Sequence, residues 1–371
     1  MNTKFDMLFS PFKLGQLHLS NRTVMAPLTR SHSPNGVPGS DVAAYYKRRA
    51  EGGISLIISE GTTINHRASN AYSDVPRFYG KDALDGWKKV LDGVHAAGAK
   101  MVPQIWHVGM HRKEGTEPVP SECGVGPIDV FEDGKLITRG LDKLEITEII
   151  AAYAQAARDA KTLGFDGVEI HGAHQYLIDQ FFWEQTNKRT DEYGGDIQKR
   201  VRFGAEVVSA VREAVGESFP ILFRFSQWKL LDYTAKIANS PEELREILMP
   251  LSDAGVDIFH ASTRRFWEPE FEGSSLNLAG WAKKITGKPS ITVGSVGLDK
   301  EFTLEHFLGT EDPQAGTTGI DELCSRLNDG EFDLVALGRA VMGDSEWVNK
   351  VKIGDLESIK PFDKVALSTL T

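Results

Sequence analysis

The chain of 371 residues is 41% hydrophobic and 25% charged, an ordinary balance for a globular protein with a core of barrel size. Its formal net charge of −10, without clustered Lys and Arg, argues against nucleic acid or an anionic membrane as a partner. The two cysteines lie far apart in the sequence and indicate neither disulfides nor structural zinc, and the polar N-terminus does not indicate secretion. No run approaches the ~18 apolar residues of a membrane span, so we expect a cytoplasmic protein.

Strand-like and helix-like segments alternate along the whole chain, which indicates a parallel sheet with crossover helices. Most of the predicted strands are continuous apolar runs, as expected of strands that are covered on both faces. In chain order they are 22–26, 54–59, 101–105, 167–170, 221–225, 258–261, 290–293 and 334–337. We therefore expect residues 1–371 to form one domain, a closed (β/α)₈ TIM barrel, with a doubly wound open sheet as the competing topology.

Amphipathic segments between these strands predict the crossover helices. Apolar residues recur at helical spacing in Leu84–Ala97, Ile146–Leu163 and Val201–Val215. Ser240 followed by Pro241 and two acidic residues is a typical helix start.

Two segments go beyond a minimal barrel. Residues Phe12 to Leu19 alternate around Gly15 and predict a short hairpin that caps the bottom of the barrel. Residues Val108 to Asp142 are rich in Pro and Gly and predict a long loop after the third strand, lying over the active-site face.

The most informative stretch surrounds the fourth strand, whose end is followed by His171, His174 and Tyr176. These side chains can donate hydrogen bonds or move protons, and the carboxyl ends of barrel strands are where such enzymes keep their chemistry. A pair of structural histidines in a loop is one alternative. Metal ligation is another, with His260 as the obvious third ligand.

Two polar residues lie within otherwise apolar strands. A buried guanidinium at Arg224 requires an anionic or strongly accepting partner, which is either a ligand or, in an internal salt bridge, Glu60 or Glu169. The amide of Gln104 offers both donors and acceptors to the edge of a heterocycle.

Glycines follow the last two strands, in Gly294–Gly297 and at Gly338 before Arg339. They let the backbone approach an anion closely and present N–H groups to it. Because this is the usual phosphate position of such barrels, we expect a phosphate group here.

Together these residues resemble the old yellow enzyme family of FMN-dependent ene-reductases. The likeness runs over nearly the whole length, and the joint order of its segments is specific although no single one decides. The segments are 8–15, 21–30, 46–53, 104–109, 166–174, 187–195 and 337–339.

The resemblance implies a site for non-covalent FMN. Thr29 would hydrogen-bond the C4 carbonyl of the flavin, which places the chain nearer the classical branch because another branch has cysteine there. Gln104 would hold the pyrimidine edge, and Arg224 would lie by N1 and O2, where negative charge gathers on reduction. The phosphate would be bound by Gly294, Ser295, Gly338 and Arg339, and the ring would lie against Ala26, Pro27 and Gly61.

The resemblance also implies a substrate site. His171 and His174 would bind the carbonyl oxygen of the substrate, with Trp106 nearby, and Tyr176 would protonate its α-carbon. The implied reaction is reduction of activated alkenes, such as α,β-unsaturated ketones and aldehydes, by NADPH or NADH, with nitro compounds as alternates. A flavin-binding sensory barrel without turnover is the alternative from another class. Relatives with an iron–sulfur cluster would need a cysteine-rich motif that this chain lacks.

Four features depart from the family pattern. Met110 stands where an arginine commonly follows, and Gln175 replaces a frequent glycine. The loop 263–275 and the C-terminal 361–364 match poorly. The tail lacks the arginine that some members lend to a neighbouring subunit, so we expect a monomer or a homodimer without a shared site.

Overall fold

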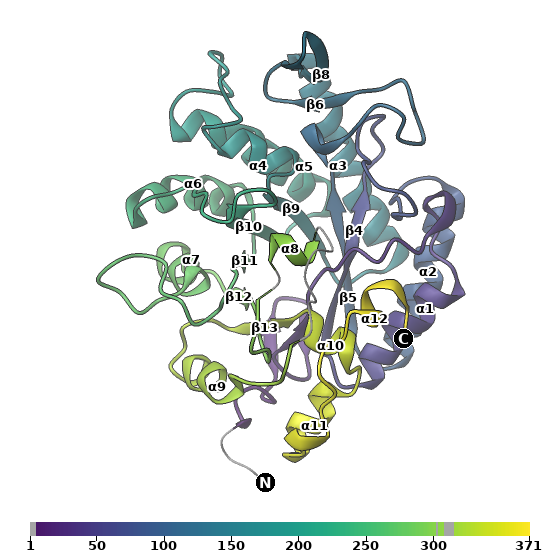
Figure 1. The fold of residues 1–371 in the computed structure, drawn as a ribbon, viewed down its shortest axis with the longest axis vertical. Coiled ribbons are helices and arrows are strands. Elements are labelled where there is room, and N and C mark those ends of the chain that lie inside the picture. Colours follow the sequence, from purple (N-terminus) through teal and green to yellow (C-terminus); the bar gives the residue numbers. More distant parts are fainter. Residues whose placement is uncertain (1–4, 302, 308–314) are drawn as a thin grey trace.

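The computed structural model describes residues 5–301, 303–307 and 315–371 (Figure 1). Residues 1–4, part of the segment that we expected to lack a secretory signal, lie outside this range. Within the described residues, no helix is both long enough and apolar enough to cross a membrane.

Eight parallel strands close into a barrel, which confirms the (β/α)₈ fold and excludes the open sheet. Around the barrel they are β3 (Thr23–Met25), β4 (Leu56–Thr63), β5 (Lys100–Trp106), β9 (Val168–His174), β10 (Ile221–Lys229), β11 (Ile258–Ser262), β12 (Ser290–Val293) and β13 (Leu334–Leu337), with β13 paired back to β3. The strands β4, β9 and β10 run about four residues past their predicted ends. His171 and His174 therefore lie within β9, not after it as we expected, because the ladder continues through polar residues.

The predicted crossover helices form as α2 (Lys81–Ala96), α3 (Lys143–Leu163), α5 (Ile197–Val215) and α6 (Pro241–Ala254). Their starts follow the expected capping chemistry, since Asp196 accepts from the backbone N–H of Lys199 and Ser240 from that of Glu243. Figure 1 shows the helices on the outside of the barrel. The remaining α-helices are α1 (Ser40–Glu51), α4 (Leu177–Phe182), α7 (Leu278–Thr286), α8 (Leu304–Phe307), α9 (Ile320–Asn328), α10 (Arg339–Gly343), α11 (Trp347–Ile353) and α12 (Val365–Ser368), and short 3₁₀ turns span Pro34–Gly36, Gly109–His111 and Leu356–Ser358.

The predicted N-terminal hairpin closes one end of the barrel. Its strands β1 (Phe12–Leu14) and β2 (Leu17–Leu19) pair antiparallel. Leu17 and Leu19 are buried in one apolar cluster with residues from the beginnings of the barrel strands, among them Val24 and Leu56. The hairpin is therefore a plug at the amino-terminal end, and the carboxyl ends of the strands are left open for a site.

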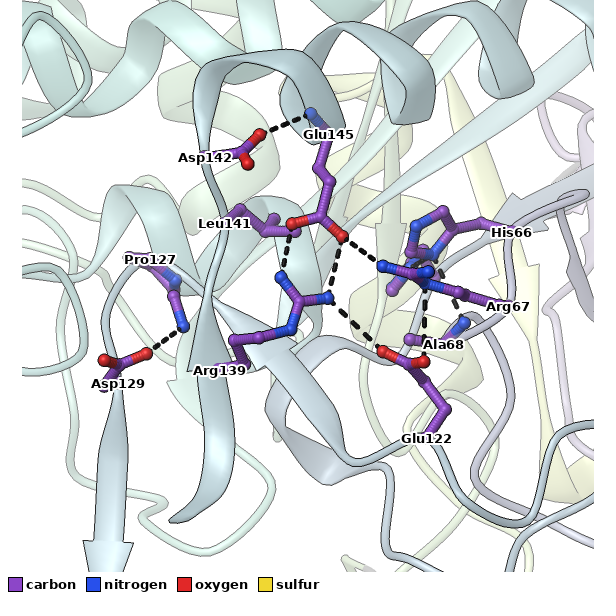
Figure 2. A network of polar contacts seen from close by, with 12 residues as sticks. His66, Arg67, Ala68, Glu122, Pro127, Asp129, Arg139, Leu141, Asp142 and Glu145 are labelled. Carbon is purple, nitrogen blue, oxygen red and sulfur yellow. Dashed lines mark hydrogen bonds and ion pairs between the residues drawn. The ribbon is translucent and has the colours of Figure 1, made fainter.

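The long segment after β5 is more ordered than the sequence predicts. It contains a three-stranded sheet of β6 (Gly124–Gly126), β7 (Val130–Glu132) and β8 (Lys135–Gly140). Figure 2 shows how this segment is fixed: Arg139 binds Glu145 at the start of α3 and, at 3.3 Å, Glu122. Arg67, from the loop after β4, binds the same two carboxylates at 2.9 Å and 3.4 Å. The loop after β4 is thus tied to the loop after β5.

Candidate active site

A cavity of about 300 Å³ lies at the carboxyl ends of the strands and gathers residues from distant parts of the chain. Its lining includes predicted cofactor residues, namely Ala26, Pro27, Thr29, Arg224, Ser295, Gly338 and Arg339. The lining also includes Trp228, Ser262 and Arg264, which sequence reasoning did not single out. Three predicted cofactor residues do not line the cavity. Gly294 lies between the lining residues Val293 and Ser295, and Gly61 pairs in register with Gln104 on the neighbouring strand.

Arg224 lies on the wall of this cavity with most of its hydrogen-bonding capacity unused. The residue is 7% exposed, and within the described residues its side chain forms one long hydrogen bond, of 3.4 Å from Nη2 to Ser262 Oγ. Burial lowers the pKa of Arg224 to about 10, so the guanidinium is still charged at neutral pH. Its Nε is buried without a partner among the described residues, and neither Glu60 nor Glu169 forms an ion pair with it there. The internal salt bridge is not observed, which leaves the charge for a ligand.

The carboxylate of Glu169 is occupied by two other partners. Its Oε1 accepts from Gln104 Nε2 at 2.8 Å, and its Oε2 lies 2.7 Å from His260 Nδ1. All three side chains are buried. The hydrogen bond fixes the amide of Gln104, whose oxygen accepts no hydrogen bond from the described residues, and the contact with Glu169 fixes the ring of His260.

Glu60 holds the backbone that follows Thr29. Its Oε2 accepts from the backbone N–H of Arg30 at 2.9 Å and of Ser31 at 3.3 Å. Burial raises the pKa of Glu60 to about 7 despite these hydrogen bonds. The conformation of the Thr29 wall therefore depends on a carboxyl group that titrates near neutral pH.

The C-terminal residues complete the same wall. Arg30 Nη2 donates to the carbonyl oxygens of Ala366 and Thr369, each at 2.7 Å. Leu367, between them, lines the cavity opposite the barrel strands. The tail that matched poorly in sequence thus packs directly against the predicted cofactor site.

The end of the cavity near β12 and β13 carries two guanidinium groups. Gly294 has φ +143°, and a Cβ there would lie 2.5 Å from Thr263 Oγ1, so only glycine fits. Ser295 Oγ donates to the carbonyl oxygen of Arg264 at 3.1 Å. Burial, and then the positive charge of Arg264, lower the pKa of Arg339 to about 10. Two positively charged guanidinium groups that line the same cavity form a favourable site for a phosphate.

His171 and His174 lie side by side, with ring centroids 5.1 Å apart. His174 Nε2 is 2.8 Å from Ser262 Oγ, and its ring stacks on Trp228 at 4.3 Å, so the pair adjoins two residues of the cavity wall. Burial, and then the charge of Arg224, hold the pKa of both rings well below the usual value. Each imidazole is therefore neutral at pH 7, with one N–H donor and no charge.

Tyr176 lies next to this pair. Its ring packs edge-on against Trp106 with centroids 4.8 Å apart, and its hydroxyl is 3.0 Å from that of Tyr72. Burial, followed by the influence of Tyr72, raises the pKa of Tyr176 well above 10, so the phenol keeps its proton at neutral pH. A Cβ on Gly61 would lie 2.7 Å from Cε3 of Trp106, which explains why this position is glycine.

A strained turn presents His174 and Tyr176. His174 and Gln175 have φ of +62° and +64°, the left-handed region that non-glycine residues rarely adopt. The backbone N–H of Gln175 donates to Asp179 Oδ2 at 2.6 Å, and Gln180 Nε2 donates to its carbonyl oxygen at 2.6 Å. Lys229 Nζ in turn donates to both oxygens of Asp179 at 2.7 Å, in a fully buried ion pair. These contacts allow glutamine where the family often has glycine.

The cavity fits the FMN that the sequence motifs imply. The buried Nε of Arg224, which has no partner among the described residues, provides a donor for an acceptor that gains negative charge, and Arg264 with Arg339 provides charge for a phosphate. At Gly338 a Cβ would meet only Leu28, at 3.7 Å, so the wall there is open. The volume of about 300 Å³ is within the range of small-molecule sites.

Comparison with known proteins agrees with this geometry. Residues 7–307 match the family described as NADH:flavin oxidoreductase / NADH oxidase. The chain is 39% identical over 348 residues to putative 12-oxophytodienoate reductase 4 of Oryza sativa subsp. japonica, covering 91% of this chain and 84% of that protein. It is 34% identical to an NADH oxidase of Thermoanaerobacter brockii over 96% of this chain, but it spans only 52% of that longer protein.

Solved structures have the same fold. Morphinone reductase superposes with a TM-score of 0.79 at 30% identity, covering 97% of this chain and 92% of the reductase. An old yellow enzyme homologue from Zymomonas mobilis has a TM-score of 0.80 at 24% identity, which supports the fold alone. The chain belongs to the NADH:flavin oxidoreductase / NADH oxidase family, which confirms both the old yellow enzyme resemblance and the FMN cofactor predicted from the sequence.

Proposed function

We propose that this protein is an ene-reductase that uses NADPH or NADH to reduce the C=C bond of α,β-unsaturated carbonyl compounds. One observation carries the proposal: two neutral imidazoles, His171 and His174, lie beside the protonated phenol of Tyr176. The three groups adjoin a cavity lined by the guanidinium of Arg224, which forms no ion pair within the described residues. Two N–H groups that can bind a carbonyl oxygen and one O–H group that can protonate a carbon thereby lie close together.

The cofactor would be held by the residues at the strand ends. Thr29, Gln104 and Arg224 would contact the polar edge of the flavin, and Ala26, Pro27 and Gly61 would lie along the ring. Gly294, Ser295, Gly338 and Arg339 would bind the phosphate, and we add Arg264 because it lines the same cavity. When bound, FMN supplies the hydride.

The two histidines would bind and polarise the substrate. A neutral imidazole can donate its N–H to a carbonyl oxygen, which draws electron density from the conjugated alkene and prepares the β-carbon for hydride. The low pKa values of His171 and His174 keep this arrangement the same over the neutral range. Trp106, whose ring lies 6.3 Å from that of His171, would form the adjacent wall.

Tyr176 would complete the reaction. Its hydroxyl proton goes to the α-carbon as hydride reaches the β-carbon, so that the alkene gains two hydrogens in total. The raised pKa of Tyr176 ensures that the proton is present at neutral pH.

The names of relatives support a reductase of small molecules. Matching proteins are described as reductases of 12-oxophytodienoate and of morphinone, and one solved structure is of morphinone reductase in complex with tetrahydroNAD. A cytoplasmic monomer or homodimer acting on activated alkenes, with nitro compounds as alternates, remains part of this proposal.

The test begins with the absorption spectrum of the purified protein, which we expect to be that of a flavoprotein. Anaerobic NADPH or NADH should then bleach the flavin, and a cyclic enone should restore the colour with formation of the saturated ketone. A coloured protein that no enone of a small panel reoxidises would instead support a flavin-binding barrel without turnover. A protein that stays colourless when offered FMN would overturn the assignment.

A further inference from the structure

We propose that Tyr72 relays protons from solvent to Tyr176 and so recharges the acid of each catalytic cycle. The inference rests on the proposed function, in which Tyr176 gives up its proton to the substrate. Tyr72 would act through Tyr176 and not on the substrate itself.

The geometry singles out one partner for the Tyr176 hydroxyl. The oxygen atoms of Tyr176 and Tyr72 are 3.0 Å apart, and no other hydrogen bond to that hydroxyl is present in the described part of the chain. His111 and His171 pack against the Tyr176 ring at centroid distances of 5.2 Å and 5.3 Å, but neither forms a hydrogen bond with its hydroxyl. Trp106, the fourth neighbour, carries no acidic proton.

A relay is needed because the proton that Tyr176 gives to the substrate must be replaced while it is being transferred. A phenolate at this position is strongly disfavoured, as the raised pKa of Tyr176 indicates. A substrate bound over His171 and His174 would cover the cavity side of the phenol. Tyr72 is not among the residues that line that cavity, so the substrate would leave its hydrogen bond to Tyr176 in place.

Tyr72 connects Tyr176 to a second cavity of about 640 Å³. This cavity lies between residues 70–79 of the loop after β4 and residues 115–118 of the segment after β5, and Tyr72 forms part of its wall. Polar groups of Asn70, Asp74 and Glu117 also line it. Such a space holds many water molecules, since one occupies about 30 Å³ in the liquid.

The Tyr72 phenol is held in a fixed position. Its ring stacks on Trp106 at 5.7 Å with 17° between the planes. Its backbone N–H donates to Asn70 Oδ1 at 3.1 Å, and its carbonyl oxygen accepts from Asn70 Nδ2 at 2.9 Å. Arg112 Nη1 donates to the carbonyl oxygen of Asn70 at 2.6 Å and so joins this turn to the segment after β5. Two ordered hydroxyls at hydrogen-bond distance are what proton transfer requires.

The proton balance closes without a further reactant. As the Tyr176 proton forms the new C–H bond at the α-carbon, the Tyr72 proton moves to the Tyr176 oxygen in the same step, and a water molecule of the second cavity protonates Tyr72. The net change is one proton taken from solvent, and no electrons pass through the relay.

The variant Tyr72→Phe tests the relay because it keeps the ring stack and removes only the oxygen. We expect enone reduction by the pre-reduced enzyme to slow by about 10-fold, a smaller loss than that of a direct general acid. Bleaching by NADPH, reoxidation by ferricyanide and the affinity for an added phenol, whose oxygen would take the place of the substrate carbonyl at His171 and His174, should stay within about twofold, because none of them needs this proton. The matched control is Tyr79→Phe, which removes a phenol oxygen from the same cavity wall without a hydrogen bond to Tyr176.

Isotope measurements separate a relay from a merely structural role. In mixtures of H₂O and D₂O, a plot of the rate of enone reduction against the deuterium fraction should be curved for the wild type, because two hydroxyl protons move. The same plot should be linear for Tyr72→Phe, in which only one proton moves. Equal enone rates in wild type and Tyr72→Phe would overturn the relay alone. Loss of phenol affinity in parallel with rate would also overturn it, in favour of positioning. A wild type that binds FMN but reduces no enone would remove the proposed function and the relay with it.

Discussion

The buried ion pair between Lys229 and Asp179 offers the sharpest test of what holds the catalytic turn. Both side chains have 0% exposure, and Lys229 Nζ contacts both carboxylate oxygens at 2.7 Å. The same carboxylate accepts the backbone N–H of Gln175, which lies in the left-handed region. The substitution Lys229→Met keeps much of the side-chain volume and removes the charge.

The expected loss follows from the uncompensated carboxylate. Removing one partner of a buried pair costs about 3–5 kcal/mol, because the remaining charge is left in a medium that solvates it poorly. Asp179 already has a raised pKa from burial, so in the variant it would take up a proton and relieve part of this cost. At roughly 2 °C per kcal/mol for a large domain, the melting temperature should fall by about 6–10 °C.

The assay is thermal unfolding of the FMN-loaded protein at fixed free FMN, combined with phenol titration to report on His174. The matched control is Lys236→Met, which breaks a pair of 3.2 Å whose lysine is 42% exposed and should cost no more than about 1 kcal/mol. The double variant Lys229→Met with Asp179→Asn should be more stable than the single one, since no charge is left buried and an amide oxygen can still accept from the backbone N–H of Gln175.

Two results would refute this reasoning. If Lys229→Met unfolds at the same temperature as Lys236→Met, the buried pair does not stabilise the native state as argued. If the double variant is as unstable as the single one, the loss comes from packing and not from an unpaired charge.

The remaining predictions concern the reaction, the cofactor and pH. Tyr176→Phe should slow enone reduction by ~10²-fold or more while bleaching by NADPH stays near normal, and equal loss in both half-reactions would remove Tyr176 from its role. Arg224→Leu should lower the flavin reduction potential by about 30–60 mV, which is the effect of removing one charge that acts over about 6–10 Å at an effective dielectric of ~20. An unchanged potential would mean that Arg224 has a structural role only. Glu60, with its pKa raised from 4.5 to about 7, binds a proton in the folded state that the unfolded chain has lost, so stability falls as pH rises through that window. Glu60→Gln should therefore remove about 3 kcal/mol of pH dependence between pH 4.5 and 7, and parallel stability–pH curves for both proteins would contradict this.

The strands of the barrel were predictable from the sequence, but their ends were not. Apolar runs begin where β10, β12 and β13 begin, because the strand interiors are buried on both sides. The ladder of β9 nevertheless continues to His174, where His171 pairs in register with Arg224. A rule that ends a strand at its last apolar residue therefore ends β9 too early, because the polar residues His171 and His174 belong to this strand.

Residues of the cavity wall that follow strands could be picked out from the sequence, whereas those that loops contribute could not. Trp228 stands three residues after Phe225 and could have been found by the same strand-end rule. Tyr72 could not, because its partner Tyr176 is 104 residues away and only the folded loops bring them together. Arg264 lies in a loop that does not match the family pattern closely, so it was found only from the cavity lining.

The wall contributed by Leu367 has a consequence for biosynthesis. Arg30 reaches across 336 positions of sequence to the carbonyl oxygen of Ala366, so one wall of the cavity is built from two segments that are far apart in the chain. On the ribosome, all eight barrel strands are translated before this later segment. Cofactor retention should therefore be acquired only after residues 366–369 have left the exit tunnel.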